Sequence, residues 1–102
     1  MNIKINFKHL DHTEALDSMI RKKSSKLEKF LPAEFDVSWT CMVQGGEHHS
    51  ELHVSAQGHT YHAKGSNDDL YKTFDDVLEK VETQIKKRKE QDKDHIHQKH
   101  KS

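Results

Sequence analysis

Histidine is the residue type in this chain that most readily suggests chemistry, with ten copies among 102 residues. His95, His97 and His100 stand near the C-terminus at spacings that a zinc or copper ion could use, and imidazole nitrogen is a common ligand for both ions. The surrounding residues have no pattern that would hold these rings in a fixed geometry. We therefore assign no metal site, expect no cofactor, and predict that any weak metal affinity lies in this terminal segment.

Other histidines fall in the middle of the chain. His48 and His49 follow a pair of glycines and are predicted to lie in a loop, whereas His53 and His62 project from neighbouring predicted strands. Polar imidazoles on a solvated surface are the simpler interpretation. The alternative hypothesis is a small protein-interaction or metal-binding module in which these surface histidines are the working groups.

Motifs typical of enzymes are missing from the sequence. It has no glycine-rich phosphate loop, no Gly-x-Ser-x-Gly, no Cys-x-x-Cys and no His-Glu-x-x-His. Neighbouring carboxylates such as Asp75 and Asp76 are interpreted as a solvated helix face. We therefore predict that the protein is not an enzyme.

Two features concern the compartment. The single cysteine, Cys41, cannot form an internal disulfide, which is typical of a reducing cytoplasm. No apolar run approaches the ~20 residues that a membrane-spanning helix needs. We expect a cytoplasmic protein without a membrane partner.

Lysine and arginine carry the strongest functional signal. The chain has 17 basic and 17 acidic residues, but the basic residues are clustered along the sequence. Residues 21–31 contain five basic residues and one acid, and residues 80–102 contain eight basic residues and four acids. Residues 32–63 contain four acids and no lysine or arginine. Clustered cations bind nucleic acid by neutralising phosphates, without reading base sequence.

The elements that must position these cations follow from hydrophobic periodicity. Apolar residues alternate with polar ones in four segments, near residues 2–7, 35–43, 52–56 and 61–63, which predicts four strands. Residues 14–31 and about 68–89 show helical spacing, and the first helix is expected to end before Pro32. Asp11 or Thr13 is predicted to cap the first helix, and Asn67 the second.

The order β-α-β-β-β-α predicts an α+β fold. The economical arrangement is a two-layer sandwich, in which a four-stranded mixed sheet is covered on one face by both helices. The first two strands should be parallel and the later pairs antiparallel. Residues 1–91 are predicted to form a single domain, and residues 92–102 a disordered tail rich in histidine and lysine.

The second helix and the segment before it resemble a known family. The matching residues are Ala63, Gly65, Asp69, Leu70, Tyr71, Phe74, Asp75, Val77, Leu78, Lys80, Val81, Gln84, Ile85 and Lys87. This pattern, together with the lysine-rich segment 23–29, is similar to the hibernation-promoting factor and ribosome-associated inhibitor family in its short form. The resemblance covers roughly residues 1–90 and implies a fold like that of a double-stranded-RNA-binding domain.

The resemblance also implies a function. It implies a ribosome hibernation factor that binds the rRNA of the small ribosomal subunit at the decoding region, blocks tRNA and mRNA, and inhibits translation under stress or in stationary phase. We expect a monomer away from the ribosome, with no DNA partner. The residues expected to contact RNA are Lys23, Lys26, Lys29, Lys64, Tyr71, Lys80, Lys86, Lys87, Arg88 and Lys89.

Overall fold

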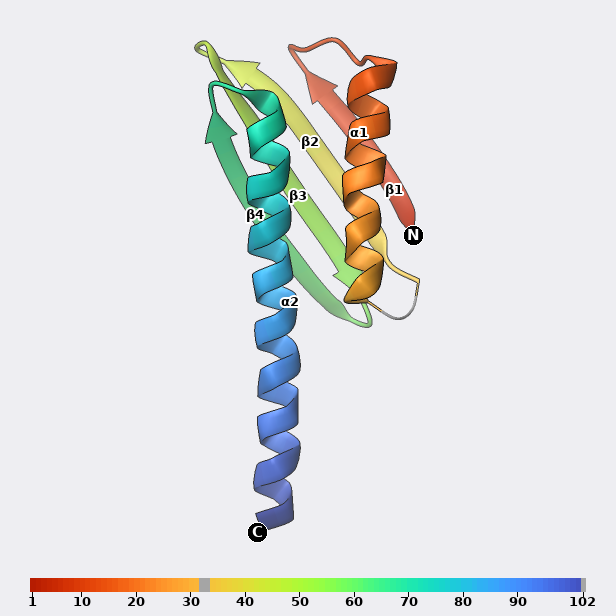
Figure 1. The fold of residues 1–102 in the computed structure, drawn as a ribbon, viewed down its shortest axis with the longest axis vertical. Coiled ribbons are helices and arrows are strands. Elements are labelled where there is room, and N and C mark those ends of the chain that lie inside the picture. The colour runs from red at the N-terminus through yellow and green to blue at the C-terminus, as the bar shows by residue number, and fades with distance from the viewer. Residues whose placement is uncertain (32–33, 102) are drawn as a thin grey trace.

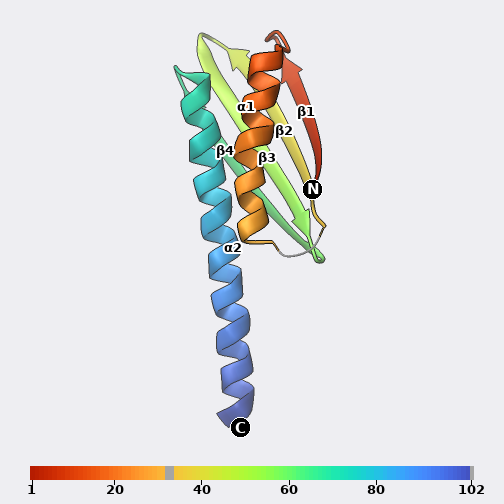
Figure 2. The same cartoon turned by 45° about the vertical axis from the view of Figure 1, so that its right-hand side comes forward.

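The protein folds into a four-stranded sheet with two helices on one of its faces, as both views of the computed structural model show (Figures 1 and 2). The structure describes residues 1–31 and 34–101, with side chains described as far as residue 91. Pro32, the expected helix end, lies outside the described residues. The predicted two-layer α+β architecture is confirmed.

The sheet has the strand order β1-β2-β3-β4. Its strands are β1 (Asn2–Lys8), β2 (Asp36–Gln44), β3 (Glu47–Ala56) and β4 (His59–Asn67). β1 pairs with β2 in parallel, and the two later pairings are antiparallel, as predicted.

Both hairpins turn through only two residues, and this corrects the predicted strand lengths. Gly45 and Gly46 have φ of 60° and 77°, and Gln57 and Gly58 have φ of 52° and 79°. Positive φ at both central residues matches the twist of paired strands, so pairing continues up to the turn. The loop expected through His49 is therefore wrong, since β3 already begins at Glu47.

The first helical segment consists of helix α1 (Glu14–Ser24) followed by a 3₁₀ helix, η1 (Ser25–Lys29). Thr13 is the N-cap: its side-chain oxygen accepts a hydrogen bond from the backbone N–H of Leu16 at 3.2 Å. The capping hydroxyl satisfies one of the backbone donors that have no partner inside the helix.

Helix α2 (Leu70–Lys101) begins later and ends later than the sequence pattern predicts. Asn67 pairs with His48, so the chain is still an extended strand at this residue. The N-cap of α2 is Asp69, whose carboxylate accepts a hydrogen bond from the backbone N–H of Tyr71 at 3.0 Å. The prediction that Asn67 is the N-cap is wrong.

The C-terminal end of α2 differs from the expected irregular tail. The backbone remains helical to Lys101, beyond Asp92, where the tail was expected to begin. No proline or glycine follows Gly65 in the sequence, so no residue there interrupts a helix. The division of the chain into a domain of residues 1–91 and a separate tail stays a prediction.

The core lies between the sheet and the helices. Trp39 from β2 and Phe74 from α2 are fully buried, and their rings meet edge to face with centroids 5.6 Å apart. Gly65 of β4 lets α2 approach closely, because an added Cβ would lie 2.6 Å from a carboxylate oxygen of Asp76. No helix among the described residues is long and apolar enough to span a membrane.

Candidate nucleic-acid interface

The end of α1 is fastened to the sheet by a buried polar link. The Ser24 hydroxyl donates a hydrogen bond to the carbonyl oxygen of Ile20 at 2.7 Å, and accepts one from the indole Nε1–H of Trp39 at 2.8 Å. All three residues are fully buried. This link fixes the point at which the chain enters η1, which presents Lys26 and Lys29 to solvent.

Phe30 joins the end of η1 to the middle of α2. The Lys86 ammonium lies 5.2 Å from the centroid of the Phe30 ring, and the Lys89 ammonium donates a hydrogen bond to the Phe30 carbonyl oxygen. Cations over aromatic faces are attracted by the ring quadrupole. Both contacts bring exposed cations of η1 and α2 together at one end of the helical layer. We call this group of six cations the basic end: Lys26, Lys29, Lys86, Lys87, Arg88 and Lys89.

Lys23 and Lys80 lie in the helical layer but are engaged within the protein. The Lys23 ammonium is 2.6 Å from a carboxylate oxygen of Asp75, and its side chain is only 19% exposed. The Lys80 ammonium lies 3.1 Å from a carboxylate oxygen of Asp76 and donates to the carbonyl oxygen of Lys64 at 2.8 Å. These two lysines therefore hold α2 against α1 and β4.

The remaining two predicted contacts lie apart from the basic end. The Lys64 side chain is exposed next to buried Ala63, so it projects from the sheet face opposite the helices, where it pairs in register with Glu51. Tyr71 stands in the first turn of α2 with 46% of its surface exposed. Its ring meets Phe74 edge to face at 6.0 Å.

Acidic side chains divide the charge along α2. Between residues 75 and 82 the helix carries four acids, Asp75, Asp76, Glu79 and Glu82, against a single lysine. The four consecutive residues 86–89 are all basic. An anionic ligand is therefore attracted to the basic end and repelled from the first half of the helix.

The exposed edge of β4 is covered by side chains of α2. The Gln84 amide donates to the His62 carbonyl oxygen at 2.7 Å and accepts from the His62 backbone N–H at 3.2 Å. Together with the Lys80 contact to Lys64, these bonds occupy backbone groups that would otherwise be open to another strand. The same bonds fix the rotation of α2 about its axis, and thereby the direction of its cations.

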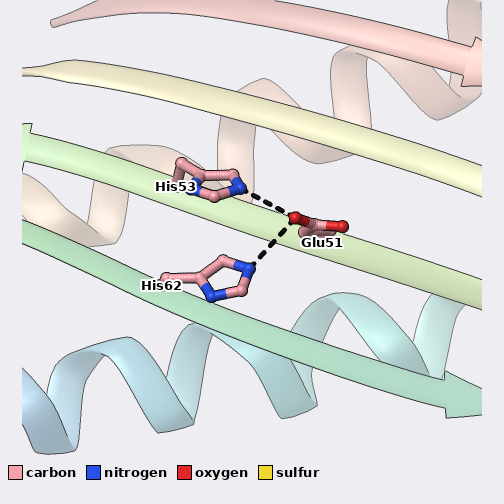
Figure 3. A group of neighbouring side chains, drawn as sticks. All are labelled: Glu51, His53 and His62. Carbon is pink, nitrogen blue, oxygen red and sulfur yellow. Dashed lines mark hydrogen bonds and ion pairs between the residues drawn. The ribbon is translucent and has the colours of Figure 1, made fainter.

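A separate polar cluster lies on the open face of the sheet (Figure 3). One carboxylate oxygen of Glu51 lies 2.8 Å from Nε2 of His53 and 3.1 Å from Nε2 of His62. The hydrogen bond from His53 is the main cause that lowers the pKa of Glu51, with His62 and Lys64 adding to it.

The alternation of residues predicts His53 and His62 on neighbouring strands, but it does not reveal their grouping with Glu51. The Gln57-Gly58 turn was the available signal, since a two-residue turn there sets His53 opposite His62.

Cys41 is the only thiol of the chain. It is fully buried in β2, and burial raises its pKa above the ordinary value. A thiol in this environment is inert, so Cys41 serves as a small core residue.

Comparison with known proteins identifies the family. The family model described as sigma 54 modulation protein / S30EA ribosomal protein matches residues 3–93. The chain belongs to this family. The resemblance found in the sequence is thereby confirmed.

Relatives of known name and structure agree with this membership. The chain is 27% identical over 95 residues to the ribosome hibernation promoting factor of Escherichia coli K12, covering 93% of this chain and 100% of that one. The Thermus thermophilus Protein Y N-terminal domain matches with a TM-score of 0.81 and 26% identity, over 85% of this chain and 98% of that one. A ribosomal subunit interface protein from Coxiella burnetii gives a TM-score of 0.75 and 28% identity, over 87% and 98%.

Proposed function

We propose that the protein is a ribosome hibernation factor. It binds the rRNA of the small ribosomal subunit at the decoding region, prevents tRNA and mRNA from binding there, and inhibits translation under stress or in stationary phase. The observation that carries this proposal is the family match over residues 3–93. Relatives that are named as a ribosome hibernation promoting factor and a ribosomal subunit interface protein support it.

The proposed mechanism requires no bond to be made or broken. A folded body held in the decoding region occupies space that tRNA needs, so the protein acts by exclusion rather than as an enzyme. Structured RNA is recognised mainly by its shape and by its phosphate and ribose groups. We further propose that the protein works in the cytoplasm as a monomer, with no membrane or DNA partner.

The basic end supplies the proposed phosphate contacts. Its six cations come from η1 and α2, and all six are exposed. Each lysine or arginine that neutralises a phosphate releases condensed counterions, which strengthens binding at low salt. We assign Lys23 and Lys80 a supporting role, since the Lys23–Asp75 ion pair and the Lys80 hydrogen bond to the Lys64 carbonyl oxygen hold α2 against α1 and β4. Tyr71 and Lys64 would touch RNA only if it reaches the far end of α2 or the sheet face.

Co-sedimentation with purified small subunits at several salt concentrations tests this assignment. We expect Lys87→Glu to weaken binding and to lower the slope of log K against log salt by about one unit, because one phosphate contact is lost. Its thermal stability should not change, since the Lys87 side chain is exposed.

Lys4→Glu is the matched control. This variant makes the same change of charge at an exposed lysine of β1. Because Lys4 alternates with Ile3 and Ile5, which face the helices, its side chain lies on the open face of the sheet. This variant should retain binding. Equal losses in Lys4→Glu and Lys87→Glu would mean that only net charge is recognised, and would refute the basic end as the interface.

A further inference from the structure

The open face of the sheet carries a group of metal-ligating side chains that the proposed ribosome contacts do not use. Glu51 and His53 project from β3 and His62 from β4, and their possible ligand atoms all lie within 4.8 Å of one another. We propose that these three side chains form a binding site for a divalent transition-metal ion of the zinc class.

The register of the hairpin builds this arrangement. His53 stands directly opposite His62, and Glu51 precedes His53 by two residues, so all three side chains share one face. The two imidazole rings are stacked with centroids 4.2 Å apart and planes 20° apart. Both Nε2 atoms point to the same oxygen of Glu51 (Figure 3). The donors therefore already converge on one point above a hydrogen-bonded pair of strands.

The donor set suits zinc. Zinc binds imidazole nitrogen at about 2.0–2.1 Å and carboxylate oxygen at about 2.0–2.2 Å, and two histidines with one glutamate form a familiar ligand set that leaves a fourth position for water. Binding requires side-chain rotations that widen the present contacts of 2.8 and 3.1 Å and turn the two nearly parallel ring planes toward the ion, since the Nε2 lone pair lies in the plane of the ring. Cu²⁺ and Ni²⁺ favour the same nitrogen donors.

Ion binding would exchange the hydrogen bonds of the cluster for metal bonds. In the metal-free protein, each ring contributes its Nε2 to a hydrogen bond with the Glu51 carboxylate. When the ion binds, it takes the lone pair of each Nε2, and each neutral ring carries its proton on Nδ1. The carboxylate supplies a negative charge to the ion, since a glutamate with an ordinary pKa of about 4.3 is ionised at neutral pH.

The charges around the cluster and its position in the fold separate it from the basic end. Residues 32–63 contain four acids and no lysine or arginine, which favours a cation. Two lysines of this face are in register with the cluster: Lys64 lies opposite Glu51, and Lys4 lies in the same cross-strand row as His53, with Ser38 between them. The basic end lies in the helical layer on the other side of the sheet. Metal binding is therefore expected to be independent of the proposed contact with rRNA.

Zinc titration of the full chain tests the proposal, with a background variant that removes competing ligands near the C-terminus. This background carries His95→Asn, His97→Asn and His100→Asn. Competition with a colorimetric chelator should show one equivalent of bound zinc. Adding His53→Asn or His62→Asn should each weaken affinity at least tenfold, which corresponds to about 1.4 kcal/mol. Glu51→Gln should also weaken it.

His59→Asn is the matched control, since it removes an imidazole from β4 outside the cluster. It should bind zinc like the background variant. Zinc should also raise the melting temperature of the background and control variants but not that of His53→Asn, because a ligand stabilises only the state that binds it. An absence of zinc binding in the background variant, or equal affinities in His53→Asn and His59→Asn, would overturn the proposal. Ribosome binding by His53→Asn, measured in parallel, separates this outcome from a failure of the proposed function.

Discussion

The two adjacent serines at the end of α1 permit a sharp test of how this helix is held. Ser24 is fully buried, and its hydroxyl lies between the Ile20 carbonyl oxygen and the Trp39 indole. The side-chain hydroxyl of the exposed Ser25 donates to the carbonyl oxygen of Lys22 at 2.6 Å. Ser24→Ala leaves the buried indole N–H without its acceptor. Leaving a buried donor unsatisfied costs about 1–3 kcal/mol.

Urea denaturation followed by tryptophan fluorescence measures this cost. We expect Ser24→Ala to lower the free energy of unfolding by about 1–3 kcal/mol. Ser25→Ala is the matched control, because it removes the same atom one residue later on the surface, and it should stay within about 0.5 kcal/mol of the parent.

A double-mutant cycle isolates the hydrogen bond itself. In a Trp39→Phe background the indole donor is absent, so Ser24→Ala should cost less than it does in the parent. Circular dichroism replaces fluorescence as the probe for this arm, since Trp39 is the only tryptophan. Equal effects of Ser24→Ala and Ser25→Ala, or an unchanged cost in the Trp39→Phe background, would refute the claim that this link fastens α1.

Three further predictions concern the core, the covered strand edge and acid stability. Phe74→Ala should cost about 3–5 kcal/mol in chemical denaturation, because a fully buried ring leaves a cavity; a cost below about 1 kcal/mol would contradict its burial. Gln84→Ala should speed hydrogen exchange of the His62 backbone N–H and cost about 1 kcal/mol, because both bonds to the edge of β4 are lost; unchanged exchange would show that the edge is not covered in solution. The ion pair with Arg21 lowers the pKa of Asp17, so its stabilising effect is present above the ordinary carboxyl pKa of about 3.9 and is lost as pH falls through the lower folded-state value. The difference in the free energy of unfolding between the parent and Asp17→Asn should therefore shrink as the pH is lowered. A difference that grows in acid would contradict the stabilising role of this ion pair.

The order of elements was predictable because each has one apolar face with a clear period. Ile3, Ile5 and Phe7 alternate as a strand must, and Leu70, Phe74 and Ile85 recur as a helix must. Strand ends were less predictable. Polar residues such as His48 and His49 carry no apolar signal, yet ladder pairing extends β3 over them once the two-residue turn is formed.

The charged surface was predictable in composition but not in detail. Sequence spacing placed Lys23 and Lys80 with the other cations, because partners distant in the chain, such as Asp75 and the Lys64 carbonyl, are invisible to it. The joining role of Phe30 was equally hidden, since it depends on α2 crossing the end of η1. Tertiary contacts decide which lysines remain directed to solvent.

A cryo-microscopy map of the small ribosomal subunit with this protein bound tests the central claim most directly. The proposal predicts density in the decoding region with the helical layer against rRNA and with Lys86, Lys87 and Lys89 beside phosphates. In that map the sheet face with His53 and His62 should point away from the contacted RNA. Density elsewhere on the subunit, or the sheet face packed against rRNA with the basic end in solvent, would contradict it.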